Sequence, residues 1–135
     1  MNDQSAAPGL MIRPSPYSVA ETASRLKEAL ARAGVTLFAE VDHAANAARR
    51  GLAMAPARVL VFGNPEVGTP LMRAVPTVAI DLPSKVLVWE GAGGQVQVAY
   101  NTPQYLKERH GISGLDDVLA RLEQGFTVLL EKALG

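Results

Sequence analysis

The chain has 135 residues, which is enough for one domain with its own hydrophobic core. It contains no cysteine, which excludes disulfide bonds, cysteine nucleophiles and thiolate-rich zinc sites. Thirteen basic side chains balance thirteen acidic ones, and this zero net charge argues against nucleic-acid binding, which needs a positive surface.

The N-terminus shows no signal-peptide pattern, and no segment is apolar over the roughly 18 residues that a membrane span needs. We therefore expect a soluble, cytoplasmic protein with no membrane partner. Residues 1–9 are expected to form a flexible N-terminus, and residues 10–135 a single domain.

The first half of the chain alternates between strand and helix patterns. Ser18-x-x-Glu21 is a capping box: the serine oxygen accepts the Glu21 amide, and the glutamate returns to the Ser18 amide. Gly34 then ends an amphipathic helix. The patterns predict a strand at 10–13, a helix at 19–33, a strand at 35–41, a short helix at 43–50 and a strand at 59–62.

The second half begins with a loop rich in Gly, Asn and Pro. Thr69 is expected to cap a helix with Pro70 in its first position, and Pro76 repeats the signal. A glycine-rich connection predicts an antiparallel hairpin, and a long apolar stripe marks the last helix. The expected elements are a loop at 63–69, two short helical turns at 70–81, strands at 85–90 and 95–100, a short helix at 103–110 and a long helix at 115–133.

The spacing Gly63-x-x-x-x-Gly68-Thr69 nearly matches a nucleotide-binding P-loop. A P-loop needs a lysine where Thr69 stands and a hydroxyl residue where Pro70 stands, so nucleotide hydrolysis is not expected. Two interpretations remain. The glycines satisfy tight turns beside Asn64-Pro65, or they present backbone amides to an anionic group at a helix N-terminus.

A small group of acidic and imidazole side chains allows a different kind of site. Glu40 and Asp42 share one side of an extended strand and His43 follows, so a metal site or an acid/base pair is geometrically possible. The alternative is that Asp42 caps a helix while His43 packs or lies on the surface. His110 lies near a helix C-terminus, where histidine commonly interacts with the helix dipole.

The predicted hairpin carries a mixture of aromatic and charged side chains. Lys85 and Trp89 share one face of their strand, Asp81 precedes it, and Tyr100 lies on the next strand. An indole and an amine on one face suit a small anionic or aromatic ligand. The alternative is a tryptophan in the core with a lysine at its rim.

Four segments, "FAEVDHAANA", "VFGNPEVGTPLM", "DLPSKVLVWE" and "VAYNTPQYLKERHG", together resemble the domain-of-unknown-function 302 family over residues 16–111. The resemblance implies an α+β fold with the order strand, helix, four strands, helix. In this helix-grip arrangement, similar to TATA-binding-protein-like domains, a curved, mainly antiparallel sheet packs against the long C-terminal helix, with short helical inserts. It implies no catalytic residues.

These observations favour a non-catalytic small-molecule-binding or sensing module that forms a homodimer, over an enzyme or metal protein using Glu40, Asp42 and His43. An oligomerisation module is the third hypothesis. No cofactor is indicated. The predicted ligand-binding residues are Asp42, His43, Asn64, Gly68, Thr69, Asp81, Lys85, Trp89 and Tyr100.

Overall fold

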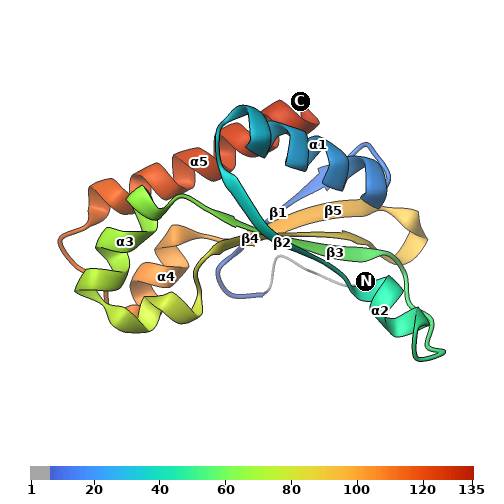
Figure 1. The fold of residues 1–135 in the computed structure, drawn as a ribbon, viewed down its shortest axis with the longest axis horizontal. Coiled ribbons are helices and arrows are strands. Elements are labelled where there is room, and N and C mark those ends of the chain that lie inside the picture. The colour runs from blue at the N-terminus through green and yellow to red at the C-terminus, as the bar shows by residue number, and fades with distance from the viewer. Residues whose placement is uncertain (1–6) are drawn as a thin grey trace.

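The fold is built on one antiparallel sheet, shown in Figure 1. A computed structural model describes residues 7–135, so most of the predicted flexible N-terminus lies outside the described residues. The strand order is β1-β5-β4-β3-β2, and each strand pairs antiparallel with its neighbours. The strands are β1 (Leu10–Ser15), β2 (Thr36–Asp42), β3 (Ala57–Gly63), β4 (Ser84–Glu90) and β5 (Val96–Asn101).

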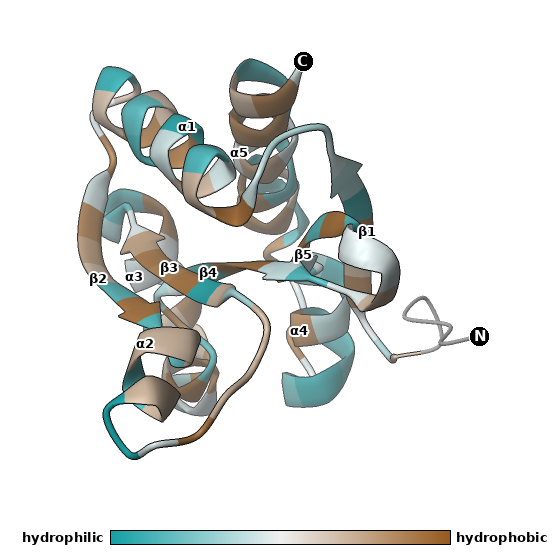
Figure 2. Cartoon of the chain, turned by 90° about the vertical axis from the view of Figure 1, so that its right-hand side faces the viewer, coloured by the Kyte–Doolittle hydropathy of each residue, from teal (hydrophilic) through white to brown (hydrophobic). Residues whose placement is uncertain are grey.

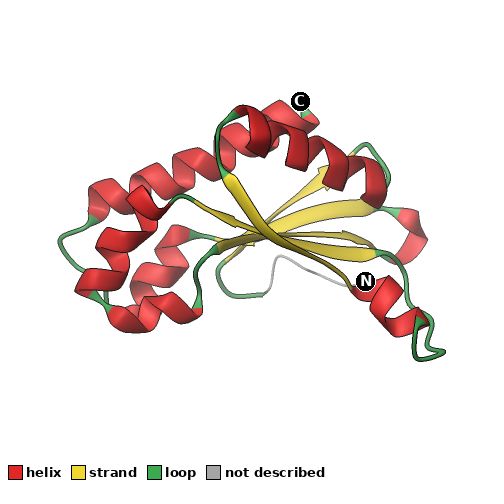
Figure 3. Cartoon of the chain, in the orientation of Figure 1, coloured by secondary structure: helices red, strands yellow, loops and turns green. Residues whose placement is uncertain are grey.

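Two long helices lie over one face of this sheet, while the shorter ones lie at its ends (Figures 1 and 3). The expected order of strand, helix, four strands and helix, with helical inserts, is confirmed. The helices are α1 (Val19–Arg32), α2 (His43–Ala48), α3 (Pro65–Ala74), α4 (Pro103–His110) and α5 (Asp116–Leu134), with 3-10 helices at Pro76–Ile80 and Ala92–Gly94.

The main core lies between the sheet and the helix pair α1 and α5, and Figure 2 shows apolar residues on both layers. Val86 and Val88 point into it and are fully buried, whereas Lys85, Leu87 and Trp89 occupy the opposite face of β4. The predicted alternation along this strand is therefore confirmed. Burial of such side chains supplies the main stabilisation of the fold.

The capping box before α1 forms only in part. The Ser18 hydroxyl accepts the Glu21 amide at 3.0 Å, as expected. The Glu21 carboxylate, however, accepts a hydrogen bond from Arg25 Nε at 3.0 Å, one turn along the helix. An oppositely charged partner at i+4 competes with the backbone amide for the same carboxylate.

The prediction of a loop at 63–69 is wrong, because α3 begins at Pro65. Asn64 is its cap: its side-chain oxygen accepts the Glu66 amide at 3.0 Å. Thr69 is therefore not a helix cap but lies inside α3, as does Pro70. The helix forgoes the one hydrogen bond that the Pro70 amide would have donated. The interpretation of Gly63 and Gly68 as tight-turn residues is also wrong, because Gly63 ends β3 and Gly68 lies inside α3.

Replacing Asn64 with alanine is expected to lower the free energy of unfolding by about 1 kcal/mol, because the Glu66 amide loses its acceptor. Urea denaturation followed by circular dichroism measures the loss. The matched variant Asn64→Asp keeps an acceptor and should retain most of the stability. Equal losses in both variants would contradict the cap.

Candidate functional site

The predicted ligand-binding residues do not form one cluster. Asp42 pairs with Arg58 in the register of β2 and β3, and Trp89 pairs with Ala57, so both lie at one end of the sheet. His43 directly follows Asp42. Asn64, the two predicted residues on α3, Asp81 and Lys85 lie toward the opposite end, where Phe62 pairs with Ser84.

Tyr100 belongs to the core beneath α5. Its ring is stacked on Phe126, with centroids 3.9 Å apart, and the residue is 3% exposed. Its hydroxyl donates a hydrogen bond to the Glu123 carboxylate. Burial, followed by this bond, raises the pKa of the Tyr100 phenol well above its ordinary value. The side chain therefore supports packing of α5 rather than facing solvent.

The carboxylates of Glu40 and Asp42 are engaged by cations. Glu40 accepts hydrogen bonds from Lys27 at 2.8 Å and Arg58 at 3.1 Å. Asp42 caps α2 through the Ala45 amide at 2.9 Å and lies 3.6 Å from Arg58. Within residues 7–135, no three His, Asp or Glu side chains are grouped as metal ligands. A metal or acid/base role for Glu40, Asp42 and His43 stays a prediction.

Replacing Glu40 with glutamine is expected to cost about 1 kcal/mol of unfolding free energy at neutral pH. The Lys27 hydrogen bond lowers the pKa of Glu40 below 4.5; burial opposes this, and Arg58 lowers it further. A lowered pKa in the folded protein means that the stabilisation is present above pH 4.5 and is lost as the pH falls through the folded value.

Urea denaturation from pH 7 down to pH 3 measures this difference between wild type and Glu40→Gln. The curves should converge in acid. The control Glu28→Gln removes a more exposed pair with Arg32 and should cost no more than about 0.5 kcal/mol. A constant gap across the pH range would contradict the role of the Glu40 charge.

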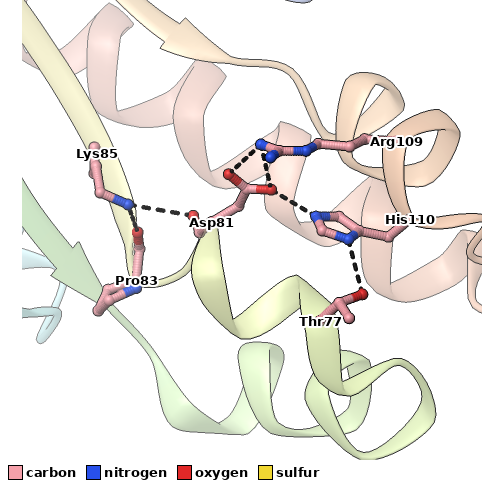
Figure 4. Close-up of polar contacts among 6 residues, drawn as sticks. All are labelled: Thr77, Asp81, Pro83, Lys85, Arg109 and His110. Atoms are coloured by element: carbon pink, nitrogen blue, oxygen red, sulfur yellow. Dashed lines mark hydrogen bonds and ion pairs between the residues drawn. The ribbon is translucent and has the colours of Figure 1, made fainter.

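Asp81 joins two segments in the network shown in Figure 4. It accepts a hydrogen bond from His110 Nε2 at 2.6 Å and two from Arg109 Nη1 at 3.0 and 3.2 Å. His110 Nδ1 lies 3.0 Å from the Thr77 hydroxyl. The hydroxyl, imidazole and carboxylate form a chain that connects the 3-10 helix at Pro76–Ile80 to the end of α4. His110 is therefore more than a dipole partner.

Other predicted residues at this end also have structural contacts. Lys85 Nζ donates to the backbone oxygens of Pro83 at 3.0 Å and Asp81 at 3.4 Å (Figure 4). Gly68 and Thr69 lie on the middle of α3, where a Cβ added to Gly68 would be 3.6 Å from Leu82. The two hydrogen bonds of Lys85 position the turn before β4.

A groove of about 800 Å³ opens between α1, α5 and the junction of β3 with α3. Of the predicted residues, only Asn64 lines it. Its aromatic members are Phe62 and Phe126, whose rings meet edge to face at a centroid distance of 6.0 Å. The other apolar side chains at the groove include Val35, Val67, Leu122, Val128, Leu129 and Ala133.

Gly125 gives the groove part of its width. It lies in the interior of α5, and a Cβ built on it would meet no atom within 4 Å. Glycine inside a helix costs about 1 kcal/mol relative to alanine, so neither helix formation nor close packing explains it. This residue is the one signal for the groove in the sequence.

The charged side chains at the groove are mainly cationic. Arg32 pairs with Glu28 at 2.5 Å, and Arg25 pairs with Glu21 at 3.0 Å. Arg121 and Lys132, both on α5, make no ion pair with any residue in the described part of the chain, 7–135. The groove thus combines an aromatic floor with two cations that remain available to a ligand.

The family model for the domain of unknown function DUF302 matches residues 11–129. This chain belongs to the DUF302 family. A crystal structure of an uncharacterised conserved DUF302 protein from Bacillus stearothermophilus shares this fold, with a TM-score of 0.82 at 20% identity. The alignment covers 94% of this DUF302 chain and 99% of that one.

The DUF302 chain is also similar to two curated proteins named "Fluoride-specific ion channel FluC 1", from Brucella suis and Brucella abortus. Each is 39% identical over 110 residues, which is 82% of this chain. The match spans only 43% and 41% of those proteins. Across residues 7–135, no helix is both long and apolar enough to cross a membrane.

Proposed function

We propose that this DUF302 chain is a non-catalytic module that binds a small molecule in the groove between α1 and α5. The observation that carries the proposal is a groove of about 800 Å³ with two aromatic rings in its wall. Ligand sites in proteins typically have volumes of about 300–1,000 Å³ and combine apolar walls with a few polar groups.

The position of the groove supports a binding role for a second reason. Its walls come from a helix pair and a strand end that the main core holds in place, because Phe126 contacts both Phe62 and Tyr100. A rigid wall loses little conformational entropy when a ligand binds. Gly125 leaves space that an ordinary helix residue would fill.

The named relatives support a sensing role. A module resembling this chain makes up about two fifths of proteins called fluoride channels. We propose that the module reports a bound ligand to such a partner. The groove is far larger than a halide ion and has an apolar floor, so we propose a larger ligand than fluoride.

Filling the groove tests the proposal. Thermal-shift screening of wild type against metabolites, lipids and sodium fluoride should find at least one organic compound that raises the melting temperature, since a ligand at about 100 times its Kd stabilises by about 2.7 kcal/mol. Gly125→Leu should abolish that shift. It places a side chain in the open space on α5.

Ala120→Leu is the matched control, because Ala120 is exposed on the same helix and does not line the groove. It should leave the shift unchanged. The proposal is overturned if no compound stabilises the wild type, or if Gly125→Leu responds to the compound as the wild type does.

We also propose that the chain is a cytoplasmic homodimer in which β2 pairs with β2 of a second copy. β2 is an edge strand, and Leu37 and Phe38 on it are 37% and 53% exposed. Unpaired backbone groups on an apolar edge favour pairing, and an antiparallel pair of identical strands has twofold symmetry. The cysteine-free composition supports a reducing compartment.

Sedimentation velocity tests the dimer. Phe38→Lys should give a monomer, because two lysines would face each other near the twofold axis. Leu52→Lys changes a residue that is 65% exposed outside the strands and should leave the dimer intact. A monomeric wild type would contradict the proposal.

A further inference from the structure

We propose that the ligand of the groove is an amphipathic anion, a carboxylate on an apolar body. This inference rests on the proposed function and names the chemical class of its ligand. It follows from the juxtaposition of an apolar wall with Arg121 and Lys132 in one groove.

Four basic side chains and one carboxylate, Glu28, line the groove, and this charge balance favours an anion. Of the cations at its rim, Arg32 and Arg25 already have carboxylate partners, Glu28 and Glu21. Arg121 and Lys132 have no carboxylate within 4.0 Å among residues 7–135, and both belong to α5. A carboxylate ligand would gain charge-assisted hydrogen bonds from either, whereas a cationic ligand would meet like charges.

The two free cations lie on the same helix but far apart. They are separated by about three turns, or roughly 16 Å along α5 at 1.5 Å per residue. The apolar side chains Phe126 and Leu129 lie between them in the sequence and line the groove. A ligand with its carboxylate at one cation therefore extends its apolar body over these residues.

The apolar wall makes the groove a poor site for a purely inorganic anion. Phe62 and Phe126 offer no hydrogen-bond donor, so a small hydrated anion would lose its water without replacement over most of the groove. An apolar body over the exposed or half-buried side chains Val35, Val67 and Val128 of the groove instead gains the free energy of surface removed from water. The combination selects molecules with both parts.

Isothermal titration calorimetry with three probes of equal chain length tests the class. The probes are octanoate, octan-1-ol and octyltrimethylammonium, at low ionic strength. Octanoate should bind at least about tenfold more tightly than octan-1-ol, and octyltrimethylammonium more weakly still. Added salt should reduce the advantage of octanoate.

A double variant separates the charge from the apolar wall. Arg121→Gln with Lys132→Gln should weaken octanoate binding about tenfold and change octan-1-ol binding by no more than about twofold. Arg50→Gln with Arg73→Gln is the matched control, because it removes the same charge at exposed positions outside the groove and should leave both affinities unchanged.

The outcomes distinguish the two proposals. Equal binding of octanoate and octan-1-ol, or tighter binding of octyltrimethylammonium, overturns the anionic class and leaves ligand binding standing. If another screened compound binds but none of these three probes does, the anionic class is likewise overturned and ligand binding stands. Absence of any ligand in the thermal-shift screen overturns both proposals. Dissociation of a wild-type dimer by Gly125→Leu also overturns both, because it would mean that a second copy of the chain occupies the groove.

Discussion

Replacing Phe126 with alanine is expected to lower the free energy of unfolding by about 3–5 kcal/mol. The ring is 6% exposed, lies parallel to Tyr100 at 3.9 Å and meets Phe62 edge to face at 6.0 Å. Truncation removes both aromatic contacts and leaves a cavity at the place where α5 rests on the sheet. Urea denaturation monitored by circular dichroism gives the loss directly.

Two controls separate the aromatic contacts from simple loss of volume. Phe126→Leu keeps most of the apolar area and should cost less than half as much as alanine. Val128→Ala, on the same helix but 36% exposed, should cost under about 1 kcal/mol. A loss below about 1 kcal/mol for Phe126→Ala would mean that the contact of α5 with the sheet does not depend on this ring.

Asp81→Ala is expected to cost about 2–3 kcal/mol. The carboxylate is 11% exposed and accepts hydrogen bonds from His110 and Arg109, so its removal leaves a 6% exposed imidazole without that partner. The network also lies beside the second core cluster, which contains Val78 and Leu106. Thermal denaturation and urea titration measure the loss.

A double-mutant cycle isolates the contact of Asp81 with His110. Asp81→Ala and His110→Ala together should cost less than the sum of the single changes by at least about 1 kcal/mol, because each single variant leaves the other group unpaired. The control Asp116→Ala removes the exposed pair with Lys107 and should cost no more than about 0.5 kcal/mol. Additive losses would show that the two residues act independently.

Most of the fold could be predicted from local patterns, and the failure at α3 shows where such patterns are ambiguous. Asn64-Pro65 and Thr69-Pro70 are both a cap residue followed by proline. Starting the helix at Pro65 places Leu71 in the second core cluster with no exposed surface. Tertiary burial of Leu71 therefore decides between two equivalent caps.

The candidate site was harder to predict for a geometric reason. Asp42 ends β2 and Asn64 follows β3, and both were assigned to one pocket. These strands are antiparallel neighbours, so their C-terminal ends lie at opposite ends of the sheet. In a parallel sheet the polar residues that follow neighbouring strands would meet at one edge.

The groove depends on segments that are distant in the sequence, since α1 and α5 are separated by the whole sheet after β1. No motif spans such a distance. Gly125 is the one local signal for the groove, because a glycine inside a strongly periodic helix pattern has no local explanation. Its role becomes visible only when α1 is placed opposite it.

The pairing of β1 with β5 has a consequence for synthesis on the ribosome. Leu10 pairs with Asn101, so β1 must wait for β5, the last of the five strands, before it gains a neighbour in the sheet. At translation rates of about 5–20 residues per second, this delay is on the order of 10 s. During that time β1 has no partner strand, and the five-stranded sheet is complete only after β5 has emerged.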